Sequence, residues 1–134
     1  MTSRRHGLVM VAAFTACAAV AACSAKRPQP AFDPAGVGGG TGFYCTQIND
    51  TSFCERSEAE CVAFVHDNSD SPSTPCTARP EATCFVVLGA ESAAGTPIPP
   101  RSFCSANITD CTRLSQSHYR GAEGDRTTAC GTIR

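Results

Sequence analysis

The sequence is poor in the large aromatic side chains with which small domains usually fill a core. Tryptophan is absent, tyrosine occurs twice, and aromatic residues make up 7% of the 134 residues. A core of this composition buries little apolar surface, so covalent cross-links must supply much of the stability. This excludes a domain that is stabilised by aromatic packing alone.

Motifs for common chemistries are also missing. No two cysteines are separated by two residues, which excludes zinc-ribbon and thioredoxin-type sites, and no Gly-x-Ser-x-Gly elbow occurs. His66 and His118 fall near the ends of predicted helices, where a positive charge suits the helix dipole. Glu55, Glu58 and Glu60 are interpreted as a solvated turn at a helix start. The sequence therefore predicts neither an enzyme nor a metal or cofactor site.

The chain begins with the three regions of an export signal. Arg4 and Arg5 precede an uncharged run of 15 residues from Leu8 to Ala22, and Lys26 follows closely. The run is shorter than the roughly 20 residues that span a bilayer. A retained anchor, a plain secretory signal and a twin-arginine signal are the alternatives; Gly7 fits the last one poorly.

Val20-Ala21-Ala22-Cys23 closes that apolar run, and it resembles the lipobox of bacterial lipoproteins. The resemblance implies that residues 1–22 are removed and that Cys23 carries diacylglyceryl on its sulfur and an acyl group on its amine. Ser24 after the cysteine favours the outer membrane, by the same resemblance. The expected partner is thus a membrane, reached through the N-terminal lipid.

The cysteine count agrees with this interpretation. Of ten cysteines, Cys17 lies within the apolar run and Cys23 is the predicted lipidation site. Eight cysteines remain, at positions 45, 54, 61, 76, 84, 104, 111 and 130. An even number in a small exported domain predicts four disulfides.

The charge balance limits the other partners. Removal of residues 1–22 leaves 112 residues with nine basic and twelve acidic side chains, and no basic stripe. This pattern argues against nucleic acid as a partner and against binding to anionic lipids through a polybasic segment. Residues 23–42 contain the lipidated cysteine followed by a Pro-rich and then Gly-rich stretch, which predicts a flexible tether.

The remaining residues, 43–134, divide into two similar parts. Six residues separate Phe53-Cys54 from Cys61, and six residues separate Phe103-Cys104 from Cys111. We interpret residues 43–82 and 83–134 as two copies of one unit. Apolar and β-branched segments around turn signals predict a hairpin in each copy, and prolines 97, 99 and 100 are expected to exclude the second connection from any ladder.

A helix is expected after each hairpin. Ser57 with Glu60, and more weakly Asn107 with Asp110, fit a capping box, and the helices are expected to end near residues 67 and 117. The predicted fold is therefore a small disulfide-rich α+β domain of tandem ββα units. Eight cysteines allow 105 pairings. We favour bridges from strand to helix: Cys45–Cys61, Cys54–Cys76, Cys84–Cys111 and Cys104–Cys130.

These observations give two functional hypotheses. The first is a lipid-anchored module of the cell envelope. Its disulfide-rich domain, which we call the stapled head, binds a protein partner or serves as a structural element. The second is an inhibitor of secreted proteases or lytic enzymes, because rigid disulfide-framed loops bind with little loss of entropy. Residues 90–100 are the candidate inhibitory loop.

Overall fold

The computed structural model describes residues 28–121 and 124–134, and its main feature is one antiparallel sheet of six strands in the order β3-β1-β2-β7-β4-β8. The predicted signal (1–22) and lipidation site (Cys23) lie outside the described residues. The sheet strands are β1 (Phe43–Ile48), β2 (Thr51–Glu55), β3 (Thr77–Arg79), β4 (Ala82–Val87), β7 (Arg101–Ser105) and β8 (Gly131–Ile133).

Each half of the domain contributes two strands, a helix and a third short strand, in that order. The helices are α1 (Glu58–Asp67) and α2 (Ile108–Arg120). The α+β class with four disulfides is thus confirmed. The finer prediction of tandem ββα units is not confirmed, because β2 of the first half pairs with β7 of the second at Cys54 and Cys104, so both hairpins belong to one sheet. A lone hairpin leaves its edges unpaired, and this pairing removes two of them.

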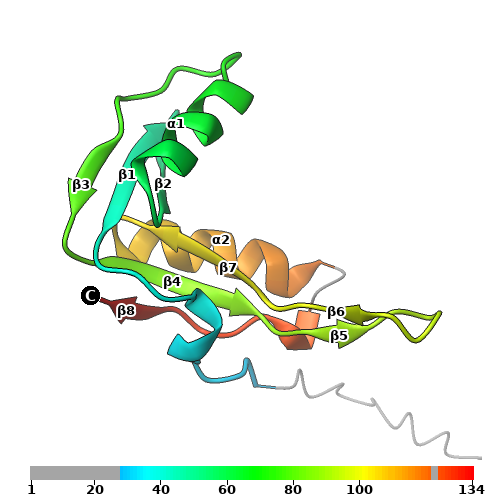
Figure 1. Cartoon of the computed structure of the whole chain (residues 1–134). Coiled ribbons are helices and arrows are strands. Elements are labelled where there is room, and N and C mark those ends of the chain that lie inside the picture. Colours follow the sequence, from blue (N-terminus) through cyan, green and yellow to red (C-terminus); the bar gives the residue numbers. More distant parts are fainter. Residues whose placement is uncertain (1–27, 122–123) are drawn as a thin grey trace, which may run out of the picture.

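The sheet is strongly curled. Figure 1 shows the β1–β2 hairpin standing at a steep angle to β4 and β7, so the six strands form half of a barrel. A single pair of residues, Cys54 and Cys104, defines the register where the two hairpins meet. No other residues of β2 and β7 are paired, so the two strands separate on either side of this pair.

Local sequence explains the first hairpin and both helix starts. Asn49 takes a positive φ of 52° in the two-residue turn between β1 and β2, a conformation that asparagine tolerates well. The Ser57 side chain accepts from the Glu60 N–H while the Glu60 carboxylate accepts from the Ser57 N–H, which completes a capping box. Helix α2 ends at residue 120, three residues later than the sequence predicted.

The two faces of the sheet are covered by different parts of the chain. Helices α1 and α2 contact the face that carries Phe53, Phe85 and Phe103. The opposite face carries the strand cysteines and is covered by residues 28–42, which we call the strap. The strap contains a short 3-10 helix, η1 (Pro34–Val37), that contacts β4 and β7, and only 4% of the surface of Val37 is exposed.

The strap corrects the prediction of a flexible tether for residues 28–42. Its start is held by the Gln29 amide, which donates to the Ser115 hydroxyl at 2.7 Å and to the Thr128 carbonyl at 2.8 Å. Its glycine-rich end wraps around the Arg56 guanidinium, which donates to three strap carbonyls and lies 4.0 Å from the centroid of the Phe43 ring. The glycines in this segment allow turns with positive φ and do not make it flexible.

All four predicted disulfide pairings are wrong, although every bridge stays within one half. The bridges are Cys45–Cys54, Cys61–Cys76, Cys84–Cys104 and Cys111–Cys130. The reason is the alternation of side chains along a strand. The strand cysteines point to the strap face and pair directly across neighbouring strands, whereas the helices cover the other face. The helix cysteines therefore reach only the segments that lead into β3 and β8.

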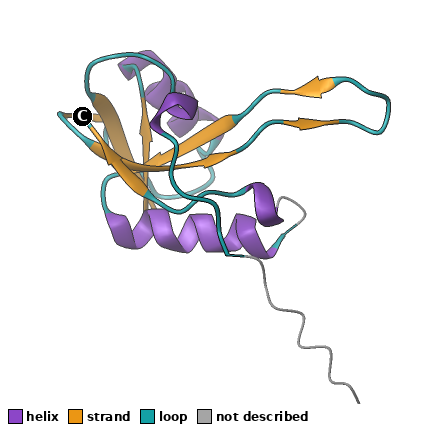
Figure 2. Cartoon of the chain, turned by 90° about the horizontal axis from the view of Figure 1, so that it is seen from below, coloured by secondary structure: helices purple, strands orange, loops and turns teal. Residues whose placement is uncertain are grey.

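A second, two-stranded ladder projects from the body of the domain. Strands β5 (Ala90–Glu91) and β6 (Pro97–Ile98) form a hairpin that Figures 1 and 2 show extending well beyond the sheet. Pro97 pairs with Glu91, so the expectation that proline would exclude this connection from any ladder is wrong. Proline is tolerated because it lies at the first residue of an edge strand, where its missing N–H costs little.

Candidate functional site

The two histidines lie at helix ends, as the sequence predicted, but in different surroundings. His66 is in the last turn of α1, largely exposed and 3.7 Å from the Asp67 carboxylate. His118 is in the last turns of α2, and its ring packs against Phe103 and Phe85, with centroids 4.7 and 5.3 Å away. Over residues 28–121 and 124–134, no group of three or more His, Cys, Asp and Glu side chains is placed to hold a metal ion.

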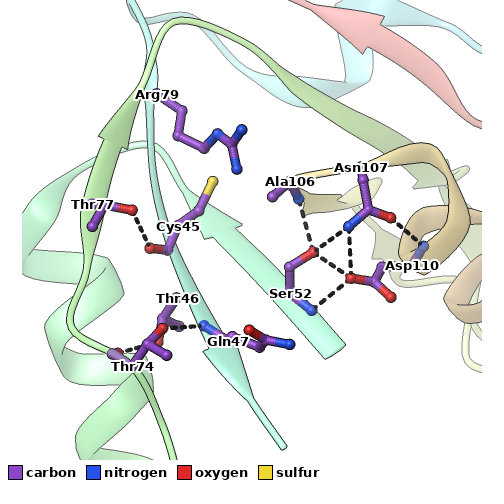
Figure 3. Close-up of a pocket in the computed structure, with 10 residues that line it drawn as sticks. All are labelled: Cys45, Thr46, Gln47, Ser52, Thr74, Thr77, Arg79, Ala106, Asn107 and Asp110. Carbon is purple, nitrogen blue, oxygen red and sulfur yellow. Dashed lines mark hydrogen bonds between the residues drawn. The ribbon is translucent and has the colours of Figure 1, made fainter. Parts of the chain in front are cut away.

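A polar pocket of about 270 Å³ lies on the strap face where the two halves meet (Figure 3). Asp110, at the start of α2, lines one side of it, and its carboxylate is buried. This carboxylate accepts hydrogen bonds from the Ser52 N–H at 2.9 Å, the Ser52 hydroxyl at 2.6 Å and the Asn107 amide at 3.0 Å, and it pairs with Arg113. Ser52 belongs to the first half, so Asp110 connects the halves.

These donors stabilise the ionised form of Asp110. Burial by itself would raise the pKa of this carboxyl, but the hydrogen bonds from Ser52, Asn107 and Arg113 outweigh it and lower the pKa from 3.8 to about 2. The Ser52 hydroxyl also accepts from the Ala106 N–H at 3.0 Å. Because these groups already bond to one another, the polar pocket is best explained as a structural junction.

A different cleft, also of about 270 Å³, lies on the helix face, and we call it the aromatic cleft. It opens between α1 and α2, over the place where β2 and β7 separate. Four of the seven phenylalanines of the chain line it, together with one carboxylate, His118 and a few smaller groups. The lining residues on which the following argument depends are Phe53, Glu55, Phe64, Phe85, Phe103 and His118.

The rings of the aromatic cleft form two groups. On one wall, Phe53 of β2 packs against Phe64 of α1 with ring centroids 5.0 Å apart and planes inclined by 44°. On the other, Phe103 of β7 stacks on Phe85 at 5.1 Å and 17°, and His118 lies against both. Phe85 is fully buried, whereas the other three phenylalanines are partly exposed. A chain with so few aromatics thus concentrates them at one concave surface.

Among the residues that the structure describes, Glu55 is the only carboxylate that lines the aromatic cleft. It ends β2 and is half-buried, and its side chain forms no hydrogen bond or ion pair with the residues that the structure describes. Desolvation by burial raises the pKa of Glu55, and the negative charge of Glu60 adds to the rise. The interpretation of Glu55 as part of a solvated turn is therefore wrong.

Sequence reasoning found parts of this cleft but did not assemble it. The repeated Phe-Cys pairs placed Phe53 and Phe103 on matching strands. What brings the two walls together is the pairing of β2 with β7, which connects residues about fifty positions apart. The local sequence contains no signal for that contact.

Comparisons with known proteins give no assignment. No protein-family model, no curated protein and no solved structure matches this chain. Within the described residues, no helix is both long and apolar enough to cross a bilayer. The function must therefore be argued from the site itself.

Proposed function

We propose that this protein is a lipid-anchored module of the bacterial cell envelope whose stapled head binds a ligand in the aromatic cleft. The observation that carries the binding part is the convergence of four phenylalanines, His118 and a carboxylate without a partner in the described part of the chain on one cleft. Partly exposed aromatic rings in a concave surface are costly to leave in water, and such sites commonly bind ligands.

The anchoring part rests on the sequence alone, namely Val20-Ala21-Ala22-Cys23 and the even number of cysteines after it. All eight cysteines from Cys45 to Cys130 are paired in disulfides, which suits an oxidising compartment outside the cytosol. We place the lipid on Cys23 and favour the outer membrane because Ser24 follows. The pairing leaves none of these eight cysteines as a thiol nucleophile, which supports binding rather than catalysis.

The strap changes the expected geometry of such an anchor. Because residues 28–42 pack on the sheet, only the four residues 24–27 remain between the predicted lipid site, Cys23, and the strap. The five steps along the chain from Cys23 to Pro28 span at most about 17 Å. The head would then lie close to the membrane surface, with the start of the strap and the end of α2 nearest to it.

Intact mass of the protein extracted from membranes tests the anchor. We expect a chain that begins at Cys23, carries lipid and shows eight thiols only after reduction. A Cys23→Ala variant should leave the membrane fraction. An unlipidated N-terminus, or a Cys23→Ala variant that stays membrane-bound, would show that the anchoring part is wrong.

The binding part is tested with the full chain in detergent micelles by NMR. A panel of small apolar, aromatic, anionic and cationic compounds is titrated while the ring signals of Phe53, Phe64 and Phe103 are followed. We expect at least one class to shift these signals in a saturable way. If no class does so, the aromatic cleft is not a ligand site.

The second candidate function is inhibition of secreted proteases or lytic enzymes, and the projecting β5–β6 hairpin favours it. The tip is ordered by hydrogen bonds between Ser92 and Thr96, and Ile98 is 42% exposed. A protruding, preorganised hairpin can enter the active-site cleft of an enzyme with little entropy loss. The purified protein should slow at least one enzyme of a broad panel, and a variant with residues 91–97 replaced by a two-residue turn should not.

We also propose that the two halves are copies of one ancestral unit. Apart from the β5–β6 hairpin and a 3-10 helix (Gly124–Arg126) that only the second half contains, the halves have the same element order and the same order of disulfides. The matched bridges have equal Cα–Cα distances, 4.0 Å in the strands and 6.2 Å at the helices. The aromatic cleft lies at the junction of these halves, so neither half would form it alone.

A further inference from the structure

We infer that the ligand of the aromatic cleft is an organic cation, an ammonium or guanidinium group carried on a short apolar chain. This inference rests on the proposed function, because it names the chemical class that the cleft would select. Three observations lead to it: the ring surfaces, the unpaired Glu55 carboxylate and the size of the cleft.

The ring surfaces come first. The faces of aromatic rings are electronegative, so a cation within about 6 Å of a ring centroid is attracted to it. Phe53, Phe64 and Phe103 all line the cleft and remain partly exposed. A cation placed between the two walls would therefore contact rings from both halves of the domain, while its apolar chain would replace the water now covering them.

The domain already uses this kind of contact within itself. The Arg56 guanidinium lies 4.0 Å from the centroid of Phe43 on the strap face. At the margin of the cleft, the Arg101 guanidinium lies 5.9 Å from the centroid of Phe103. That distance is at the outer limit of a favourable contact, so Arg101 interacts with this ring only weakly.

Glu55 supplies the charge that distinguishes a cation from a neutral apolar ligand. Its carboxylate is half-buried beside the rings and has no partner among the described residues. Burial and the neighbouring Glu60 raise its pKa, which shows that the ionised form is poorly compensated. A ligand cation would supply the missing countercharge. A ligand carboxylate or phosphate would be repelled.

The cleft volume of about 270 Å³ limits the ligand to a small group. It is below the roughly 300–1,000 Å³ of ordinary small-molecule sites. One alkylammonium chain fills a space of this order. The group can come from a free amine or from a lysine or arginine side chain of a protein partner, and the chemistry that recognises it is the same.

The first experiment titrates the full chain in micelles with n-hexylammonium and, separately, with the neutral n-hexanol. Binding is followed through the ring signals of Phe53, Phe64 and Phe103. We expect hexylammonium to bind at least tenfold more tightly than hexanol. Equal or tighter binding of hexanol would overturn the cation inference while leaving the cleft as a ligand site. If neither compound nor any other class binds, the proposed function fails as well.

Variants identify the groups responsible. Glu55→Gln should weaken hexylammonium about tenfold and leave hexanol unchanged, whereas Glu91→Gln, in the distant β5–β6 hairpin, should change neither. Phe64→Leu places in α1 the residue type found at the matching Leu114 of α2, and it should weaken the ammonium several-fold. Retention of full affinity by both Glu55→Gln and Phe64→Leu would overturn the inference. Dispersed amide spectra check that each variant is folded.

A last comparison distinguishes the two sources of the cation. Hexylammonium is compared with a short capped peptide containing one lysine and with the same peptide in which norleucine replaces the lysine. Tighter binding of the lysine peptide assigns the cleft to a protein partner, and tighter binding of the free amine assigns it to a small molecule. Binding of the norleucine peptide as strong as that of the lysine peptide would count against a cation.

Discussion

The two halves of this domain share their element order and their disulfides, yet they bury different amounts of their side chains. In the second half, every residue of β4 is buried, with α2 on one face and the strap on the other. In the first half, the only buried residue of α1 is Cys61, and Val62 is 55% exposed. The second half thus forms the core of the domain, whereas the helix of the first half covers the sheet with few buried side chains.

The difference extends to matching residues. Asp110 and Glu60 occupy the same position in their helices, but Asp110 is buried and bonds across to Ser52, whereas Glu60 serves only its own helix start. Gly131 pairs with Cys84 under the strap, while Thr77, in the matching place beside Cys45, is exposed. Each pair offers a matched experiment.

The largest effect is expected for the buried ring of β4. Phe85 follows Cys84, as Thr46 follows Cys45 in the first half, and it is fully buried. Phe85→Ala should lower the free energy of unfolding by about 3–5 kcal/mol, because a large cavity is left in the core. Thr46→Ala should cost about 1 kcal/mol, since it removes one hydrogen bond to the Thr74 carbonyl. Urea unfolding measures both values, and equal losses would contradict a core centred on the second half.

The Asp110 junction should give the next largest effect. Asp110→Asn removes the charge that receives the hydrogen bonds from Ser52, and we expect a loss of about 2 kcal/mol at pH 7. Glu60→Gln is the matched control, and it should cost less than about 1 kcal/mol because a glutamine can still complete the cap. Urea unfolding at neutral pH compares the two. A loss for Glu60→Gln as large as that for Asp110→Asn would show that Asp110 has no special role.

The stability of the protein at acid pH should depend on the same Asp110 junction. The pKa of Asp110 is about 2 in the folded protein, below the ordinary 3.8, so its ionised form stabilises the fold. This contribution, of about 2 kcal/mol, is fully present above pH 4 and is lost as the pH falls toward 2. Stability measured between pH 2 and 6 should therefore fall less steeply in Asp110→Asn than in the wild type. Parallel curves for the two proteins would argue against the lowered pKa.

An intermediate loss of stability is expected when a single methyl group is added beneath the strap, at Gly131. A Cβ at Gly131 would lie 2.0 Å from the Phe32 ring, whereas one at Gly39 would meet nothing within 4 Å. Gly131→Ala should therefore cost about 1–3 kcal/mol by lifting the strap, and Gly39→Ala should leave stability nearly unchanged. Amide hydrogen exchange across the strap checks where the loss arises. Unchanged protection in Gly131→Ala would show that the strap does not rest on β8.

The smallest effect concerns Glu55. Because burial raises the pKa of this carboxyl, its ionised form opposes folding, and stability should decrease as the pH rises through that pKa. Glu55→Gln should thus be slightly more stable than the wild type at pH 7, and the difference should shrink on acidification. Glu58→Gln, on the exposed part of α1, is the control. A Glu55→Gln variant that is less stable than the wild type at pH 7 would indicate a partner for this carboxylate.

Much of the local structure was predictable from the sequence. The turn of the first hairpin, the Ser57 capping box and the helix starts are determined by short-range chemistry, and the hairpin and the helix starts lie where they were expected. The turn also contained an unused signal. A two-residue turn at 49–50 places Cys45 directly opposite Cys54, so this disulfide was available from the register.

By itself, then, the sequence determined the two main hairpins, the helices, the number of disulfides and their confinement to each half, because these follow from turns, caps and cysteine spacing. Only the tertiary structure decided how the cysteines pair, where residues 28–42 go and which side chains share a cleft. Those outcomes depend on the face to which each side chain points and on the contact between β2 and β7. Such a contact joins residues far apart in the chain and depends on how both halves bury their surfaces together.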